Sequence, residues 1–296
     1  MKLATDTFML RPQPLDAVFR IPAEAGYSFV EFAPRDEVLP SYGGRRAARA
    51  TIEEIRMASR RYQVGIASFF VEQAWGSSDE RVQEAAVRYI HQAIETAVDV
   101  GCDRINLEFS GIPDRPREGE AALRSSLDAL LPVCESEGVT LAIEPHPGDW
   151  MESGFRAVDF IRGLQSPNVT YLHCVPHTFF LTGVMDERGQ VKGVNRDLMA
   201  YAGTTMGHVH LADTLLPGRT FLNPARADIP YPTLPHVRNH QHLDIGQGDV
   251  DWDEVFSGLQ AVGFDGVLTV CVFRHEDRVM DSLRHNREEI RRRLGI

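Results

Sequence analysis

Residues 120–146 read EAALRSSLDALLPVCESEGVTLAIEPH and contain one complete unit of a repeating pattern. Apolar residues recur every three or four positions up to Glu137, which is typical of a helix that packs on a core by one face. Gly138 follows, and glycine most readily takes the left-handed conformation that ends a helix. The run 140–144 is then short, almost entirely apolar and followed by a polar loop. The stretch therefore predicts a helix, a turn and a buried strand.

The same alternation of short apolar runs and amphipathic segments recurs about eight times along the chain. The predicted strands are 3–10, 28–32, 64–70, 104–109, 140–144, 169–174, 207–212 and 267–273. The predicted helices are 47–62, 79–100, 120–137, 153–164, 196–203, 251–262 and 277–294. Eight units with nearly continuous apolar strands favour an α/β fold, a closed (β/α)8 TIM barrel that forms a single domain over residues 1–296. A doubly wound open sheet is the alternative, and it is disfavoured because no GxGxxG motif or phosphate-binding loop opens a helix.

Composition restricts the class of protein. The chain has 43% hydrophobic and 25% charged residues, and it has neither an apolar run of about eighteen residues nor a basic and apolar leader, so we expect a cytoplasmic protein without a membrane partner. The formal net charge of -11 argues against a nucleic-acid partner, because binding of that polyanion depends on Lys and Arg. The four cysteines show no CxxC spacing. We therefore expect them to be reduced, buried thiols.

Residues capable of chemistry follow the predicted strands at one end. In a parallel barrel the carboxyl ends of all strands meet at one rim, where the active sites of such barrels lie. The residues found there are Glu108, Glu144, His146, His173, Cys174, His177, His210 and Cys271. Each could be purely structural, as a paired carboxylate or a hydrogen-bonded core histidine. Together, imidazoles and a carboxylate suit a divalent ion such as Zn, Mn, Co or Fe, and suit Ca poorly.

A second group of histidines lies in HQHLDIGQG, residues 240–248. His240 and His242 are two positions apart, so in an extended chain both imidazoles project to one side and can bind one ion, although an exposed pair in a loop also fits plain polar surface. The pair ends a proline-rich connection, 213–245, which we expect to be a lid-like loop over the carboxyl-terminal face after the seventh strand. Within it, Arg219 is a candidate for binding a substrate hydroxyl or phosphate, with solvated surface as the alternative.

These motifs resemble the xylose-isomerase-like superfamily of TIM barrels, which includes sugar isomerases and epimerases, enzymes of inositol catabolism and endonuclease IV. The similarity covers essentially the whole chain. In that superfamily a metal-binding Glu ends the fifth strand, which matches Glu144; an Asp-x-x-His pattern ends the sixth, which falls on CVPH, 174–177; and an H-x-x-D motif ends the seventh, which matches HLAD, 210–213. The stretches 207–214, 240–252 and 266–273 resemble the myo-inositol-catabolism branch most.

The chain departs from the family pattern at two positions. The usual Asp of the sixth strand falls on Cys174, with His173 as a neighbouring alternative, and the usual Glu of the eighth strand falls on Cys271. Three histidines, His177, His240 and His242, fall where endonuclease IV has ligands of one zinc. The resemblance thus implies a divalent metal ion held by a set drawn from Glu144, Cys174, His177, His210, His240 and His242.

The resemblance implies a metal-dependent isomerase or epimerase that acts on a sugar or an inositol-derived keto sugar. Glu144 is then the candidate base that removes the proton next to the carbonyl. His177 or His146 would move or return the proton, and Cys271 is either an acid in that step or a buried thiol. Glu108, His173 and Arg219 are the candidates for substrate binding.

Two other functions remain open at this point. A metal-dependent hydrolase of the endonuclease-IV type would use His177, His240 and His242, and a barrel without catalysis would only bind a sugar. In each case except DNA hydrolysis the expected partner is a small carbohydrate or polyol-derived molecule. A homo-oligomer is compatible with all of these readings.

Overall fold

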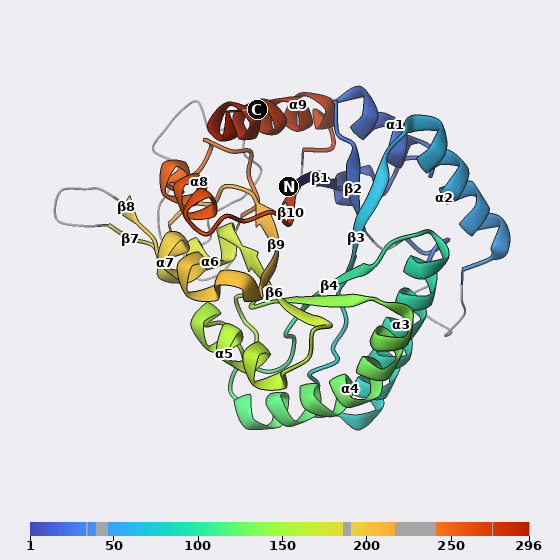
Figure 1. The fold of residues 1–296 in the computed structure, drawn as a ribbon, viewed down its shortest axis with the longest axis vertical. Coiled ribbons are helices and arrows are strands. Elements are labelled where there is room, and N and C mark those ends of the chain that lie inside the picture. The colour runs from blue at the N-terminus through green and yellow to red at the C-terminus, as the bar shows by residue number, and fades with distance from the viewer. Residues whose placement is uncertain (34, 40–46, 186–190, 217–240, 274, 296) are drawn as a thin grey trace.

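Eight parallel strands form a closed barrel in the computed structural model (Figure 1), which confirms the predicted (β/α)8 architecture. The structure describes residues 1–33, 35–39, 47–185, 191–216, 241–273 and 275–295. In chain order the barrel strands are β1 (Lys2–Asp6), β2 (Phe29–Phe32), β3 (Gly65–Val71), β4 (Arg104–Glu108), β5 (Thr140–Glu144), β6 (Val169–Cys174), β9 (Met206–Leu211) and β10 (Val267–Val270). The first and last of these strands pair in parallel and close the barrel.

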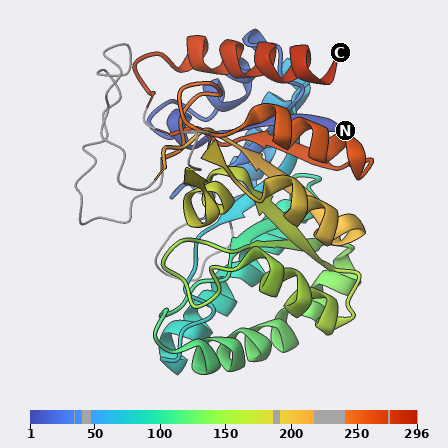
Figure 2. The ribbon, with the colours of Figure 1, turned by 90° about the vertical axis from the view of Figure 1, so that its left-hand side faces the viewer.

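Helices surround the barrel on the outside (Figures 1 and 2). They are α1 (Ala17–Glu24), α2 (Arg49–Tyr62), α3 (Glu80–Asp99), α4 (Pro116–Glu137), α5 (Gly154–Leu164), α6 (Val175–Thr182), α7 (Asn195–Ala202), α8 (Trp252–Ala261) and α9 (Val279–Leu294), with two 3-10 turns at Phe8–Leu10 and Gly203–Thr205. The seven predicted helices are present with ends shifted by up to four residues. No helix among the described residues is long and apolar enough to cross a membrane.

Two of these helices, α1 and α6, have no counterpart in the sequence prediction. Each has only eight residues, and α1 contains Pro22, which normally argues against a helix interior. Most of α6 is buried around its circumference, so it has no polar face and shows no amphipathic period. The first predicted strand, 3–10, was also too long, because its last three residues form the turn Phe8–Leu10.

The connection from β6 to β9 contains an insertion. Between α6 and α7, the short strands β7 (Val184–Met185) and β8 (Val191–Lys192) pair in antiparallel fashion. This hairpin projects from the ring of helices in Figure 1. The insertion leaves the barrel itself complete, because β6 still pairs directly with β9.

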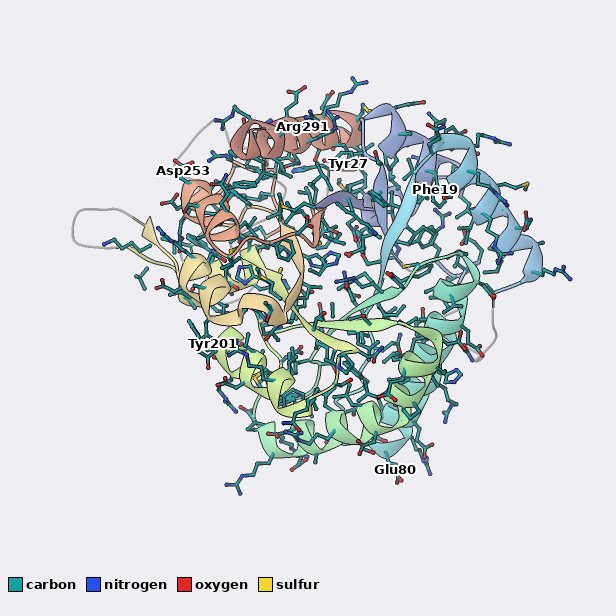
Figure 3. The ribbon with its side chains drawn as sticks, in the orientation of Figure 1. Phe19, Tyr27, Glu80, Tyr201, Asp253 and Arg291 are labelled. Atoms are coloured by element: carbon teal, nitrogen blue, oxygen red, sulfur yellow. The ribbon has the colours of Figure 1, made fainter. Side chains whose placement is uncertain are left out.

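The hydrophobic core lies between the strands and the helices that cover them. Figure 3 labels Phe19 of α1 and Tyr27, which are both buried in it, and it shows Glu80, Asp253 and Arg291 on the outer rim. The hydroxyl of Tyr27 donates a hydrogen bond of 2.9 Å to the carbonyl of Leu283 and so fixes α9 against the start of β2. A buried Tyr needs such a partner because its hydroxyl loses water.

The register of the strands brings the candidate site residues together. Glu108 of β4 lies beside Glu144 of β5, and Cys174 of β6 lies beside His210 of β9. Because parallel strands share one carboxyl end, residues far apart in the chain meet at one rim.

Candidate active site

His210 occupies the centre of the barrel mouth and lies between two buried carboxylates. Its Nδ1 atom is 3.3 Å from Oε2 of Glu144, and its Nε2 atom is 3.0 Å from Oε1 of Glu31. All three residues are at most 1% exposed. Burial acts to lower the pKa of His210, but Glu31, Cys271 and Glu144 outweigh it and raise that pKa well above its ordinary value. Burial acts to raise the pKa of Glu31, but His210 and other neighbours lower it to about 2.

Two thiols flank His210. Sγ of Cys174 lies within 4.8 Å of ligand atoms of Glu144 and His210, and Sγ of Cys271 lies within the same distance of ligand atoms of Glu31 and His210. Burial raises the pKa of the Cys174 thiol, as does the Glu144 carboxylate, and burial raises the pKa of Cys271. Both cysteines are therefore protonated at neutral pH unless a metal ion binds and displaces the proton.

A second pair of imidazoles, His177 and His242, forms the outer wall of the site. His177 belongs to the first turn of α6, and its Nδ1 is 3.3 Å from the Pro145 carbonyl. The Nδ1 atom of His242 is 2.6 Å from the Cys271 carbonyl, and its ring stacks on Phe273 at 4.5 Å. A carbonyl can only accept, so each Nδ1 carries the proton and each Nε2 presents a lone pair. These two Nε2 atoms are 3.2 Å apart.

The loop that carries His242 is fixed by one buried carboxylate. Asp213 accepts hydrogen bonds from the backbone N–H groups of Gly246 and Val250 and from the indole of Trp252. Leu243 pairs with Asp213 in an antiparallel bridge. Gly248 packs directly on this carboxylate, since a Cβ atom there would lie 2.0 Å from Oδ1 of Asp213. The H-x-x-D and G-x-G motifs thus form one structural unit that holds the His242 loop in position.

Additional carboxylates lie on the β3 to β5 side of the mouth. Nε2 of His146 is 3.7 Å from Oε1 of Glu108. A carboxylate oxygen of Asp149 lies within 4.8 Å of possible ligand atoms of both residues. Burial raises the pKa of Glu108 well above its ordinary value, and Glu144 and Asp149 add to the effect. Burial likewise raises the pKa of Asp149 to about 7. Burial and the neighbouring carboxylates thus favour the protonated form of Glu108, which donates as well as accepts a hydrogen bond.

The donor atoms at the centre fit a divalent metal ion. Oε2 of Glu144, Oε1 of Glu31 and both ring nitrogens of His210 are buried and make no hydrogen bond of ordinary geometry. The lone pairs of His177 and His242 converge on Cys174, with all three ligand atoms within 4.8 Å. Buried ion pairs whose hydrogen bonds are poorly aligned are costly, and lone pairs that face one another repel. A cation bound among them would remove both penalties.

Comparison with known families agrees with this geometry. The family model described as "Xylose isomerase-like TIM barrel" matches residues 19–293. The chain belongs to this xylose isomerase-like family. The curated proteins give no match.

The xylose isomerase-like chain also resembles solved structures over its full length. A D-tagatose 3-epimerase-like protein is 18% identical with a TM-score of 0.74, and the match covers 100% of this chain and 97% of that one. The IOLI protein with a binding zinc atom is 16% identical with a TM-score of 0.73, covering 100% and 98%. The 3-keto-D-glucoside 4-epimerase YcjR from E. coli is 19% identical with a TM-score of 0.69, covering 97% and 99%. At these identities the likeness establishes the fold.

Most of the predicted site residues in this xylose isomerase-like barrel lie together. The central cluster contains Glu144, Cys174, His177, His210, His242 and Cys271, and Glu108 and His146 adjoin it. His173 does not lie with this group, and its Nε2 is 2.9 Å from Oδ1 of Asn195 in α7. Adjacent strand residues point to opposite faces, so Cys174 faces the site and His173 faces the helices. Arg219, His240 and most of the predicted lid, 213–245, lie outside the described residues.

Sequence reasoning missed Glu31 and Asp149. Glu31 is the only charged residue in the apolar run 28–32, and a lone carboxylate in a buried strand is a signal that it faces a polar interior. Asp149 follows His146 in the loop after β5, where it accepts a hydrogen bond of 2.7 Å from the Ser110 amide. Only its position after a strand end could have drawn attention to it.

Proposed function

We propose that this chain is a metal-dependent isomerase or epimerase that acts on a small keto sugar or an inositol-derived ketone in the cytoplasm. The observation that carries the proposal is the position of Glu144. Its Oε2 is buried and without a hydrogen bond, 3.3 Å from His210 at the strand end where barrel enzymes carry out chemistry. Epimerases among the structures of similar fold support this class of reaction.

Glu144, Cys174 and His210 would hold the ion, with His177 and His242 available on the outer side. Nitrogen and sulfur donors suit Zn²⁺ and other borderline ions better than Mg²⁺ or Ca²⁺. When bound, such an ion supplies positive charge to the carbonyl oxygen and adjacent hydroxyl of the substrate and so stabilises an enediolate. The structure of similar fold that contains a zinc atom supports a metal ion in this chain.

Glu144 would remove the proton from the carbon next to the carbonyl. In the family pattern a second carboxylate follows the eighth strand, where this chain has Cys271. His177 can therefore return the proton instead, because its ring nitrogen lies 3.7 Å from Glu144, and His146 contacts His177 edge to face at 4.7 Å between ring centres. The thiol of Cys271 remains a second candidate for this step.

Glu108 would bind a substrate hydroxyl. It is half-buried at the mouth next to Glu144 in the strand register, and a carboxyl group accepts a hydrogen bond from a hydroxyl and, when protonated, also donates one. Arg219 and His240 stay proposals from the sequence, as substrate-binding residue and additional ligand. The same holds for the lid over residues 213–245.

Hydrogen exchange at carbon tests this function. The protein is incubated in heavy water with Zn²⁺, Mn²⁺ or Co²⁺ and with inosose, ketohexoses or tartronate semialdehyde, and the loss of the proton signal next to the carbonyl is followed by NMR. Exchange that depends on both metal and Glu144 supports the proposal. Stoichiometric metal with no exchange on any of these carbonyl compounds would favour a barrel that only binds its ligand.

A second candidate is a metal-dependent hydrolase. The approach of His177 and His242 to 3.2 Å supports it, because these positions match zinc ligands in endonuclease IV. The net charge of -11 opposes a DNA substrate. Incubation of the metal-loaded protein with a duplex containing one abasic site tests it directly, and cleavage of that strand would replace the isomerase proposal.

A further inference from the structure

Glu31 forms the floor of the site and is held there by hydrogen bonds to one of its two oxygens. Oε2 accepts a bond of 2.6 Å from the Ser68 hydroxyl and another from the side-chain amide of Asn106. Nε2 of His208 is 3.3 Å from the same oxygen. Glu31, Ser68, Asn106 and His208 are all fully buried. The carboxylate therefore cannot rotate without breaking two buried hydrogen bonds.

The other oxygen of Glu31 points to the metal-binding histidine. Oε1 is 3.0 Å from Nε2 of His210 and has no hydrogen bond of ordinary geometry. On the opposite edge of the ring, Nδ1 of His210 faces Glu144 and Cys174. A small rotation of the imidazole would complete a bond from its Nε2–H group to Glu31.

We propose that Glu31 is the positioning residue of the site: it receives the Nε2–H of His210 and so turns the Nδ1 lone pair toward Glu144 and Cys174. A histidine ligand generally needs such an acceptor, because the partner of the second nitrogen fixes which nitrogen is left to bind the ion. The inference rests on the proposed metal site. It adds a carboxylate from β2 to a ligand set that otherwise comes from β5, β6 and β9.

Glu31→Gln is a sharp test because the environment fixes the orientation of the new amide. The oxygen position that receives both Ser68 and Asn106 suits the Gln carbonyl, since both groups donate to it in their present orientations. The NH₂ group must then face His210 and needs an acceptor there. Nε2 of His210 becomes that acceptor, so the proton moves to Nδ1 and the nitrogen beside Glu144 is blocked.

The experiment measures two quantities in wild type and Glu31→Gln. Zn²⁺ affinity is determined by competition with a chromophoric chelator, and the proton position on His210 is read from ¹⁵N–¹H correlation spectra of histidine-labelled protein in metal-free and Zn²⁺-loaded forms. The His210 signals are assigned as those missing in His210→Asn. We expect a proton on Nε2 only in Zn²⁺-loaded wild type, protons on both ring nitrogens in metal-free wild type, a proton on Nδ1 only in metal-free Glu31→Gln, and an affinity that is about 10–100-fold weaker in the variant.

Ser126→Ala serves as the control for a general loss of stability. Ser126 is a fully buried residue of α4 and donates to the Trp75 carbonyl, so its loss should lower Tm without changing Zn²⁺ affinity. Glu31→Asp keeps the charge and should restore part of the affinity.

Three results would overturn the inference. These are unchanged affinity in Glu31→Gln, a proton that stays on Nε2 in that variant, or complete loss of zinc with the proton still on Nε2, which would make Glu31 a direct ligand. If wild type binds no metal at all, the proposed function loses its metal dependence. The presence of the Nε2 proton in metal-free wild type and its loss in metal-free Glu31→Gln then still decide the role of Glu31.

Discussion

Nε2 of His177 and Nε2 of His242 lie 3.2 Å apart although the two residues are 65 positions apart in the chain. Each ring is oriented by a backbone carbonyl at its Nδ1, that of Pro145 or Cys271. The backbone of two different loops therefore directs both lone pairs to one point. Two neutral imidazoles repel in this arrangement, whereas a shared proton or a metal ion makes it favourable.

Replacing His242 by Ala should lower the metal content of the protein. Its Nε2 is lost from the group of Cys174, His177 and His242, and the remaining ligands bind less tightly. Metal analysis of protein purified without chelators measures the effect. His91→Ala, on the outer helix α3, is the matched control and should leave the metal content unchanged. Full stoichiometry in His242→Ala would return this histidine to a structural role.

Replacing Glu144 by Gln should reduce proton exchange and turnover by about 10²–10⁴, the usual contribution of a general base. The amide keeps the shape of the side chain but cannot take a proton. The comparison is made by NMR in heavy water at saturating metal, with Tm as a check on folding. Glu120→Gln is a suitable control, because Glu120 forms only an exposed ion pair with Arg124 on α4. Exchange at the wild-type rate in Glu144→Gln would remove it from the mechanism.

Gly248→Ala should destabilise the protein by about 3 kcal/mol, the upper end of the range for overpacking. The new Cβ would lie 2.0 Å from the Asp213 carboxylate and 2.4 Å from the Thr214 carbonyl, and neither can move without breaking the bonds that hold the His242 loop. Gly163→Ala in α5 is the opposite case, because nothing lies within 4 Å of its Cβ position. Alanine there should stabilise by about 0.5–1 kcal/mol. Urea unfolding of both variants measures the difference, and equal free energies of unfolding would contradict the packing described here.

The thiols should be unreactive in the folded protein. All four cysteines are buried, and burial raises the pKa of both Cys102 and Cys134 to about 12. A thiol that stays protonated does not attack a disulfide reagent. Ellman's reagent at pH 8 should detect no thiol in native protein and all four after unfolding. Fast reaction of any one of them in the native state would show an opening of the structure that reaches that cysteine.

The carboxyl group of Asp149 should make stability depend on pH. Burial raises its pKa from 3.8 to about 7 in the folded state, so the folded protein holds a proton that the unfolded chain has released. Its contribution to stability is therefore complete below about pH 4 and is lost as pH rises to about 7. The free energy of unfolding of wild type relative to Asp149→Asn should fall across this window and be flat above it. A relative stability that rises with pH would mean that Asp149 is ionised in the folded protein.

The barrel was predictable from the sequence because its signals are local and repeated. Apolar strands such as β5 and amphipathic helices such as α4 each show their period within one segment. The two missed helices are short, and α6 lies in a stretch that is buried on nearly all sides, so no period distinguishes it. The contact of the missed residue Glu31 with His210 depends on the closure of the barrel, which brings β2 across from β9, and the lone carboxylate in an apolar run does not show which residue it meets.

The candidate site was predictable where a chemically active residue lies at the carboxyl end of a predicted strand, as for Glu144 and His210. Side-chain direction was less accessible. Cys174 and His173 are neighbours with similar claims in the sequence, and only the structure shows that the histidine turns to Asn195. Neighbouring residues on a strand point to opposite faces of the sheet, so taking Cys174 or His173 as the site residue changes the predicted face.

The ends of the stretch 217–240 are tied together by residues that the structure describes. The side-chain oxygen of Gln241 accepts hydrogen bonds from the Thr214 hydroxyl and the Leu215 amide. Next to this contact, Asp213 and Leu243 form an antiparallel bridge. Doubling the length of a loop costs only about 0.6 kcal/mol of closure entropy. A change in the length of this stretch therefore costs little stability, and the tie between Asp213 and Leu243 still holds His242 in place.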